Sequence, residues 1–251
     1  MTFKQAMMVV VGIVLVSLAG CTAPTKGKDH QMRYAVHRVA EPITIDANWD
    51  KPPWRKIEPL ELANYMGQRP RHFPRTQAKL AYDDQGIYVI FRVEDRYIRA
   101  VARQHQDMVC RDSCVEFFFA PHTDLAKGYF NLEMNCGGTM LLNYQVIPRQ
   151  NMIPLSASIL ERIEVAHTLP KIVDPEIAEP TTWTVEYRLP VDFLGQCHPS
   201  PVKPAPGVSW RTNFFKCADE TSQPHWLTWA RVDRPKPDFH VPEYFGTLEF
   251  K

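Results

Sequence analysis

Hydrophobic and polar residues alternate along short segments of this chain, the pattern typical of half-buried β-strands. The clearest case predicts a hairpin, with strands at 78–82 and 87–93 joined by a turn at Asp83–Gly86. A second predicted hairpin pairs 114–119 with 129–134, and Gly137 and Gly138 after it indicate a sharp turn. These two hairpins predict a series of antiparallel strands.

The remaining periodic segments are equally short, and Gly and Pro separate them. One helical turn is expected near 190–194, and no segment predicts a long helix. Many short strands at near-regular spacing predict an all-β sandwich or barrel in one domain over residues 33–251. The further strands that the pattern predicts are 34–39, 43–45, 140–144, 159–165, 183–189, 209–215 and 246–250.

Composition supports a loop-rich β protein, since the chain of 251 residues holds 22 Pro and 11 Gly. Its formal net charge is +1, and it falls to 0 if residues 1–20, which carry the charge of Lys4, are removed. A neutral body lacks the basic excess of a nucleic-acid-binding protein, so no nucleic-acid partner is expected.

The N-terminus has the form of a secretory signal. Lys4 precedes an apolar run at Met7–Leu18, which is short for a membrane span, and small residues then lead into Cys21. This order resembles a bacterial lipoprotein signal, which implies a signal peptide at 1–20, a lipidated Cys21 and a polar tether at 21–32. An ordinary signal peptide is the alternative. The lipoprotein interpretation implies a bacterial cell-envelope location, and Thr22 after the cysteine favours the outer membrane by resemblance.

Five other cysteines remain, and an oxidising compartment favours disulfides among them. Cys197 could pair with Cys217, and Cys114 could face Cys136 across a hairpin, although the sequence does not decide between pairings. The spacing of His105, Cys110, Cys114 and Cys136 is not that of a standard zinc site.

A polar cluster on the second predicted hairpin is the best candidate site. Glu116 alternates with Val115 and Phe117, so it points away from their face, and Glu133 lies on the strand expected to pair with it. Arg111 lies at the start of the strand that carries Glu116. A solvated outer face or an internal Arg–carboxylate pair is the alternative.

Two tryptophans offer the flat ring that a sugar face packs against, namely Trp226 and Trp229. Their spacing of three does not place them on one strand face, so we expect at most one to face a ligand and the other to lie in the core.

In order and spacing these strands resemble family 9 carbohydrate-binding modules over nearly all of residues 33–251. No single element is specific, but together they support the resemblance. The matching elements are Ile45-Asp46-x-x-Trp49 with Trp54, Val93-Glu94-Asp95, Asp112-Ser113-Cys114-Val115-Glu116-Phe117-Phe118, Tyr129-x-x-x-Glu133-x-Asn135-x-x-Gly138, Trp183-Thr-Val-Glu186-x-x-x-Pro190, Trp210-Arg-x-Asn213-Phe214 and Phe239-His240-x-Pro242-x-x-Phe245-Gly246-x-Leu248.

The resemblance implies an immunoglobulin-like antiparallel β-sandwich, of the class shared by family 9 modules and DOMON domains, that binds sugar between two aromatic rings. It implies that Glu116 bonds sugar hydroxyls, with Arg111 in place of a family arginine and Asn213 as a further candidate. Residues 107–111 hold no aromatic side chain where the family places one ring. Some members bind calcium, which makes the oxygen-rich loops at 46–50 and 83–85 candidate sites.

These observations lead to a functional hypothesis: a lipid-anchored carbohydrate-binding protein that holds a glycan or oligosaccharide in support of separate glycoside hydrolases or transporters. Two alternatives remain open. An envelope interaction lipoprotein without sugar binding is favoured by the missing aromatic residue. A glycoside hydrolase would need two carboxylates across a cleft, and Asp112, Glu116 and Glu133 are the candidates.

Overall fold

The computed structural model describes residues 32–251. The predicted signal peptide, Cys21 and nearly all of the tether lie outside this range. Within it, no helix is long and apolar enough to cross a membrane. The strands are β1 (Arg33–Arg38), β2 (Leu60–Glu61), β3 (Asn64–Tyr65), β4 (Arg75–Tyr82), β5 (Gly86–Asp95), β6 (Ile98–Ala100), β7 (Cys114–Ala120), β8 (Tyr129–Asn135), β9 (Met140–Gln145), β10 (Ile153–Pro154), β11 (Glu164–His167), β12 (Val173–Ile177), β13 (Thr181–Pro190), β14 (Ser209–Cys217), β15 (Trp226–Thr228) and β16 (Gly246–Phe250).

The helical segments are each a single turn: α1 (Pro52–Arg55), α2 (Ala157–Leu160), α3 (Leu194–Cys197) and the 3₁₀ turns at Val109–Arg111, Leu125–Lys127 and Pro242–Tyr244. The fold is thus all-β, as the alternating pattern predicts.

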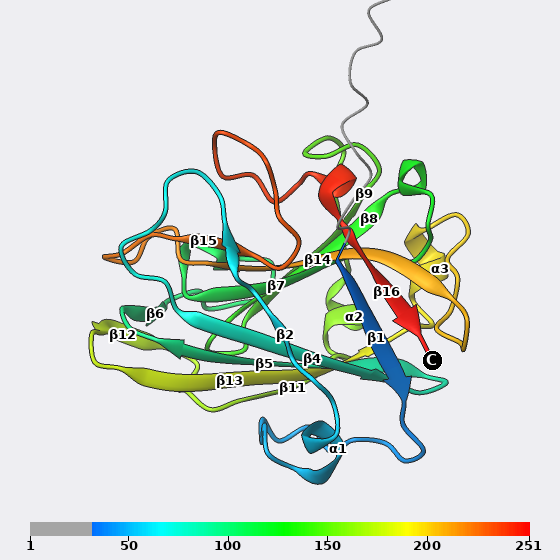
Figure 1. The fold of residues 1–251 in the computed structure, drawn as a ribbon, viewed down its shortest axis with the longest axis horizontal. Coiled ribbons are helices and arrows are strands. Elements are labelled where there is room, and N and C mark those ends of the chain that lie inside the picture. Colours follow the sequence, from blue (N-terminus) through cyan, green and yellow to red (C-terminus); the bar gives the residue numbers. More distant parts are fainter. Residues whose placement is uncertain (1–31) are drawn as a thin grey trace, which may run out of the picture. The chain divides into compact units, whose positions relative to one another are not determined.

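Two layers of strands face each other (Figure 1). The first sheet runs β10-β9-β8-β7-β14-β16, and the second runs β4-β5-β13-β11. Strand β1 joins them, because Arg33–Val36 pair with β16 and His37–Arg38 pair with β4. These two pairings are parallel, whereas the other pairings between described strands are antiparallel.

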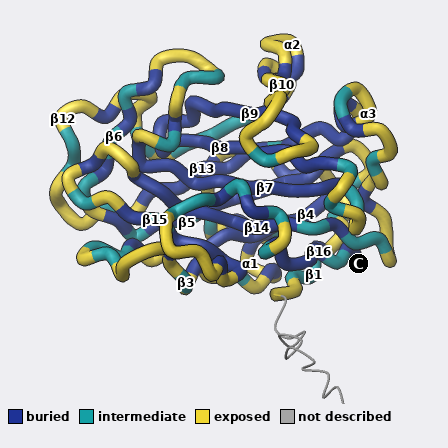
Figure 2. Tube along the Cα trace, turned by 90° about the horizontal axis from the view of Figure 1, so that it is seen from above, coloured by how far each residue is buried: buried dark blue, intermediate teal, exposed yellow. Residues whose placement is uncertain are grey.

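The core lies between the two sheets. Phe117 and Phe214 stack there from the first sheet with ring centroids 5.0 Å apart, and Phe91 and Trp183 meet them from the second. Buried strands run through the middle of the molecule and exposed loops surround them (Figure 2). This burial of aromatic and branched side chains drives the two layers together.

Some sequence-based expectations for strands are wrong. Residues 43–45 form no strand, and only the end of the predicted strand at 159–165 belongs to one, since α2 occupies 157–160. The helical turn falls at 194–197 rather than 190–194. The short strands β6 and β12, which pair only with each other, lack the alternation that would have predicted them.

The glycine turn after β8 is present as predicted. Gly138 has a φ of +80°, a conformation that side chains rarely adopt, and a Cβ there would lie 2.6 Å from the His167 ring. The turn aligns β9 with β8, so that Asn143 faces Asn131 in register.

A buried carboxylate holds the segment between β1 and β2 against the second sheet. Glu186 of β13 is fully buried and accepts hydrogen bonds from the backbone N–H of Ala47 and the indole of Trp54, at 2.7 and 2.8 Å. The ammonium group of Lys51 lies 2.7 Å from the same carboxylate. Two of the sequence elements shared with family 9 therefore have a structural role here.

Candidate functional site

The outer face of the first sheet carries the polar side chains that the sequence singles out. Along β7, Val115, Phe117 and Phe119 point into the core between the sheets. Cys114 and Phe118 belong to a second buried cluster on the opposite face, and Glu116 lies between them in the alternation. The expectation that Glu116 points away from the core is confirmed.

Loops cover this face and leave a pocket of about 280 Å³ over it. The covering segments are the turn at Val109–Arg111, the loop after β9 and the loop before the final 3₁₀ turn. The side chains that line the pocket are Met108, Cys110, Glu116, Phe118, Asn131, Glu133, Leu141, Asn143, Arg149, Met152, Cys217, Asp219, Trp226, Pro237, Asp238, Phe239 and His240. A hollow of this size fits a small ligand.

Two carboxyl groups stand side by side among these residues. Glu116 and Glu133 are directly opposite each other in the β7–β8 pairing, and both are buried. The amide of Asn131 donates to Glu133 Oε1 at 2.9 Å, and Gln145 donates to Asn131 Oδ1 at the same distance. The site thus contains a row of linked acid and amide groups, which can both donate and accept hydrogen bonds.

Burial raises the pKa of both Glu116 and Glu133, and the mutual proximity of the two carboxyls raises that of Glu116 further. Asp219 adds to both shifts, and its own pKa is raised by burial. Like charges close together in a low-dielectric site cannot all ionise at low cost. The pair therefore tends to hold a proton, which gives the site a carboxyl donor beside an acceptor.

These raised pKa values predict how stability depends on pH. A carboxyl whose pKa is higher in the folded protein stabilises the fold at low pH. For Glu133 that contribution is lost as pH rises from about 4.5, the ordinary pKa, through about 7, the raised pKa in the folded protein. Glu133→Gln should therefore unfold at a higher temperature than the wild type at pH 8, while the difference shrinks at pH 5. The gain at pH 8 is on the order of 1 kcal/mol, because one pKa unit corresponds to about 1.4 kcal/mol.

Thermal unfolding of both proteins at the two pH values measures this effect. The matched control is Glu41→Gln, since Glu41 is exposed. An equal shift in melting temperature at pH 5 and pH 8 for Glu133→Gln would contradict the expectation.

The structure separates the two tryptophans. Trp226 is half-buried, lines the pocket and donates from its indole nitrogen to Asp219 Oδ1 at 2.8 Å. Trp229 lies in the core between the sheets, where its ring meets Phe214 edge-on at 5.7 Å. Only Trp226 is placed to contact a ligand in this pocket.

Two further predicted residues lie away from the pocket lining. Asn213 is buried and pairs with the backbone of Ala230, donating to its carbonyl at 3.0 Å and accepting from its N–H at 2.8 Å. Arg111 is 57% exposed and forms an ion pair with Glu220 at 3.2 Å, beside a neighbouring hollow. In the structure Asn213 holds a loop to β14, and Arg111 faces solvent.

Sequence reasoning missed several pocket residues. Asn131 on β8 and Asn143 on β9 line the pocket and continue the polar face that begins at Glu133. Gln145 on β9 supports them from outside the lining through its hydrogen bond to Asn131. The alternation of these residues with apolar ones was a signal that could have found them. Phe239 and His240 come from a loop with no periodic pattern, so only the tertiary structure places them at the pocket.

Neither candidate disulfide is present, and the five cysteines of the described residues are free. Cys136 and Cys197 pack with the core between the sheets, whereas Cys114 and Cys217 pack on the outer face of the first sheet. Each of the two pairings that the sequence left open would have to cross the sheet, so neither fits the structure.

In the two oxygen-rich loops considered for calcium, carboxylate oxygens already accept hydrogen bonds or ion pairs from other groups of the protein. Asp46 Oδ1 lies 2.7 Å from the Lys51 ammonium, at a position a cation would need. Asp83 accepts from two backbone N–H groups and from the Tyr88 hydroxyl at 2.6 Å. Calcium takes six to eight oxygen ligands, and in these two loops Asp46 and Asp83 are already engaged by donors of the protein.

The chain is similar to known proteins in both sequence and fold. The family model for carbohydrate-binding family 9 matches residues 45–250. A search of curated protein sequences finds no match. Among solved structures, a candidate carbohydrate-binding protein from Bacteroides uniformis is similar with 27% identity and a TM-score of 0.76, over 87% of this chain and 99% of that one.

The fold is also shared with a family 9 module from Caldicellulosiruptor kristjanssonii, solved with cellotriose and with glucose. Identity is 16% and the TM-score 0.60 in both cases, over 88% of this chain and 94% or 96% of the other. With the match of the family model over most of its length, this chain belongs to carbohydrate-binding family 9.

Proposed function

We propose that this protein binds a neutral saccharide in the pocket over the first sheet. The observation that carries the proposal is the row formed by Glu116, Glu133 and Asn131 in the same pocket as the half-buried ring of Trp226. Carboxyl and amide groups bond sugar hydroxyls in the ring plane, and an indole packs on the apolar face of the ring.

The charge of the pocket bears on the ligand class. Four acidic side chains line it, and Asp238 already engages Arg149 at 2.7 Å. An anionic sugar would meet like charge here, so a neutral sugar is favoured. Glucose and cellotriose, which the module from Caldicellulosiruptor kristjanssonii holds, are the first ligands to test.

The cellular setting is a further part of the proposal. The signal-like N-terminus with Cys21 supports an extracytoplasmic protein that is anchored in the bacterial envelope by lipid on that cysteine. In this setting the domain would retain a glycan or oligosaccharide near separate hydrolases or transporters.

A second candidate function rests on the rim of the pocket. Met108 and Met152 line its mouth and are 55% and 48% exposed, and Val146 and Ile147 nearby are also exposed. Apolar side chains at these positions favour a role in protein interaction for an envelope lipoprotein without sugar binding.

Calorimetric titration with a panel of mono- and oligosaccharides decides between the two functions. We expect saturable heat with one class of neutral sugar, led by glucose and β-linked gluco-oligosaccharides, and none with uronic acids. Absence of heat across the panel would overturn the sugar-binding proposal, and retention of a protein from envelope extracts would then support the interaction role.

A further inference from the structure

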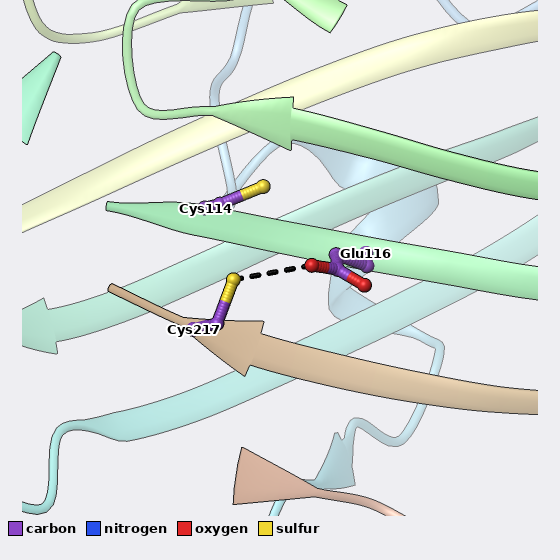
Figure 3. Close-up of side chains that lie close together, drawn as sticks. All are labelled: Cys114, Glu116 and Cys217. Carbon is purple, nitrogen blue, oxygen red and sulfur yellow. Dashed lines mark hydrogen bonds between the residues drawn. The ribbon is translucent and has the colours of Figure 1, made fainter. Parts of the chain in front are cut away.

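The thiols of Cys114 and Cys217 lie beside the acidic pair, and the sugar-binding proposal does not account for them. Strand pairing places Cys114 of β7 directly opposite Cys217 of β14, and Glu116 follows two residues along β7 on the same face. We call these three residues the thiol cluster. Figure 3 shows the Cys217 sulfur pointing toward the Glu116 carboxyl group.

The thiol cluster brings three possible metal ligands together. One ligand atom from each residue lies within 4.8 Å of the other two. Within residues 32–251, no other group of three or more His, Cys, Asp or Glu side chains meets this condition. All three residues are buried.

One polar atom of the cluster has no partner. Glu116 Oε1 accepts from the Cys217 thiol at 3.1 Å, but Glu116 Oε2 is buried without a hydrogen bond among the described residues. Glu116 itself is 1% exposed. An unsatisfied buried acceptor is costly, so a site that leaves one next to two thiols calls for a bound group.

From these observations we propose that Cys114, Glu116 and Cys217 bind a thiophilic divalent cation, with zinc as the representative. Two thiolates and one carboxylate match the ligands that zinc takes, and three protein ligands leave a fourth position for water or a molecule in the pocket. Calcium requires more oxygen ligands than the cluster supplies. The inference goes beyond sugar binding, although Glu116 serves in both.

The surroundings of the cluster suit a cation. Cys110 and Glu133 line the same pocket, so further donors stand on the route from solvent to Glu116 and Cys217. Of the basic side chains that line the pocket, Arg149 is paired with Asp238, and burial lowers the pKa of His240 to about 4, which leaves it neutral near pH 7. The basic side chains of the pocket lining therefore leave the cluster without a competing charge. The buried ammonium of Lys216, the neighbour of Cys217 on β14, is paired with Asp95 at 3.5 Å.

The test is a titration of the intact, reduced protein with Co²⁺ alone, followed by displacement with Zn²⁺. We expect a thiolate-to-cobalt charge-transfer band and visible bands of a tetrahedral site, at one ion per chain. Cys114→Ser and Cys217→Ser should each weaken Co²⁺ binding at least tenfold. Cys197→Ser is the matched control and should bind as the wild type does, since Cys197 ends α3 and packs with the core between the sheets, away from the cluster. Excess Ca²⁺ should not displace the bound Co²⁺.

Three results would overturn the metal site: no thiolate band with the wild type, bands that survive in both cluster variants, or recovery of Cys114 and Cys217 as a disulfide in the protein as isolated. The wild-type titration tests the metal site even if a variant fails to fold. Sugar calorimetry on the same sample keeps the two proposals separate, because a protein that binds sugar without a thiolate band refutes only the metal site.

Discussion

Replacing Glu186 with alanine is expected to lower the free energy of unfolding by about 3–5 kcal/mol, the range for breaking a buried charged pair. The carboxylate is fully buried on β13, and the ammonium group of Lys51, a residue only 8% exposed, lies 2.7 Å away. The backbone N–H of Ala47 and the indole of Trp54 also donate to it. The substitution leaves the Ala47 and Trp54 donors without their acceptor and leaves Lys51 with Asp46 as its remaining carboxylate partner. Chemical denaturation measures the cost.

The matched control is Glu164→Ala on β11. Glu164 is 59% exposed and pairs with Arg188 at 3.3 Å, and an exposed ion pair contributes about 0–1 kcal/mol. If the two variants lost the same stability, the buried carboxylate would not have the anchoring role assigned to it. Sugar binding by folded Glu186→Ala should be unchanged, because Glu186 lies on the second sheet, away from the pocket.

Glu116→Ala is expected to reduce the affinity for the proposed saccharide about 100-fold. A hydrogen bond to a charged group contributes about 1.5–3 kcal/mol, and 1.4 kcal/mol is a factor of ten in affinity. The fold should stay cooperative, because the change removes a buried carboxyl whose pKa is raised by burial and by Glu133. Calorimetry with the sugar that the wild type binds measures the loss.

Arg111→Ala is the informative control for this prediction. The resemblance to family 9 gives Arg111 a role in binding, whereas the structure places it on the surface with Glu220. We therefore expect Arg111→Ala to keep wild-type affinity. Unchanged affinity in Glu116→Ala, or an equal loss in both variants, would move the binding site away from the pocket.

The architecture of the protein could largely be read from its alternating pattern. The hairpin of β4 and β5 and the pairing of β7 with β8 follow from residues close in sequence, and the side-chain period of two decides which face each residue joins. For the same reason the sequence placed Glu116 and Glu133 together on the outer face. It also separated Trp226 from Trp229, which cannot share a strand face at a spacing of three.

The sequence could not show what covers that face. The pairing of β14 with β7 joins segments about 100 residues apart, and it alone brings Cys217 to Cys114 and Glu116. Phe239, His240 and Arg149 reach the pocket from loops without a periodic pattern. The same long-range packing directs Arg111 to solvent and Asn213 to a loop. Alternation determined the faces of the strands, because it is a local property of the backbone. Only the tertiary structure decided which side chains meet across the pocket, because loop positions depend on contacts between distant segments.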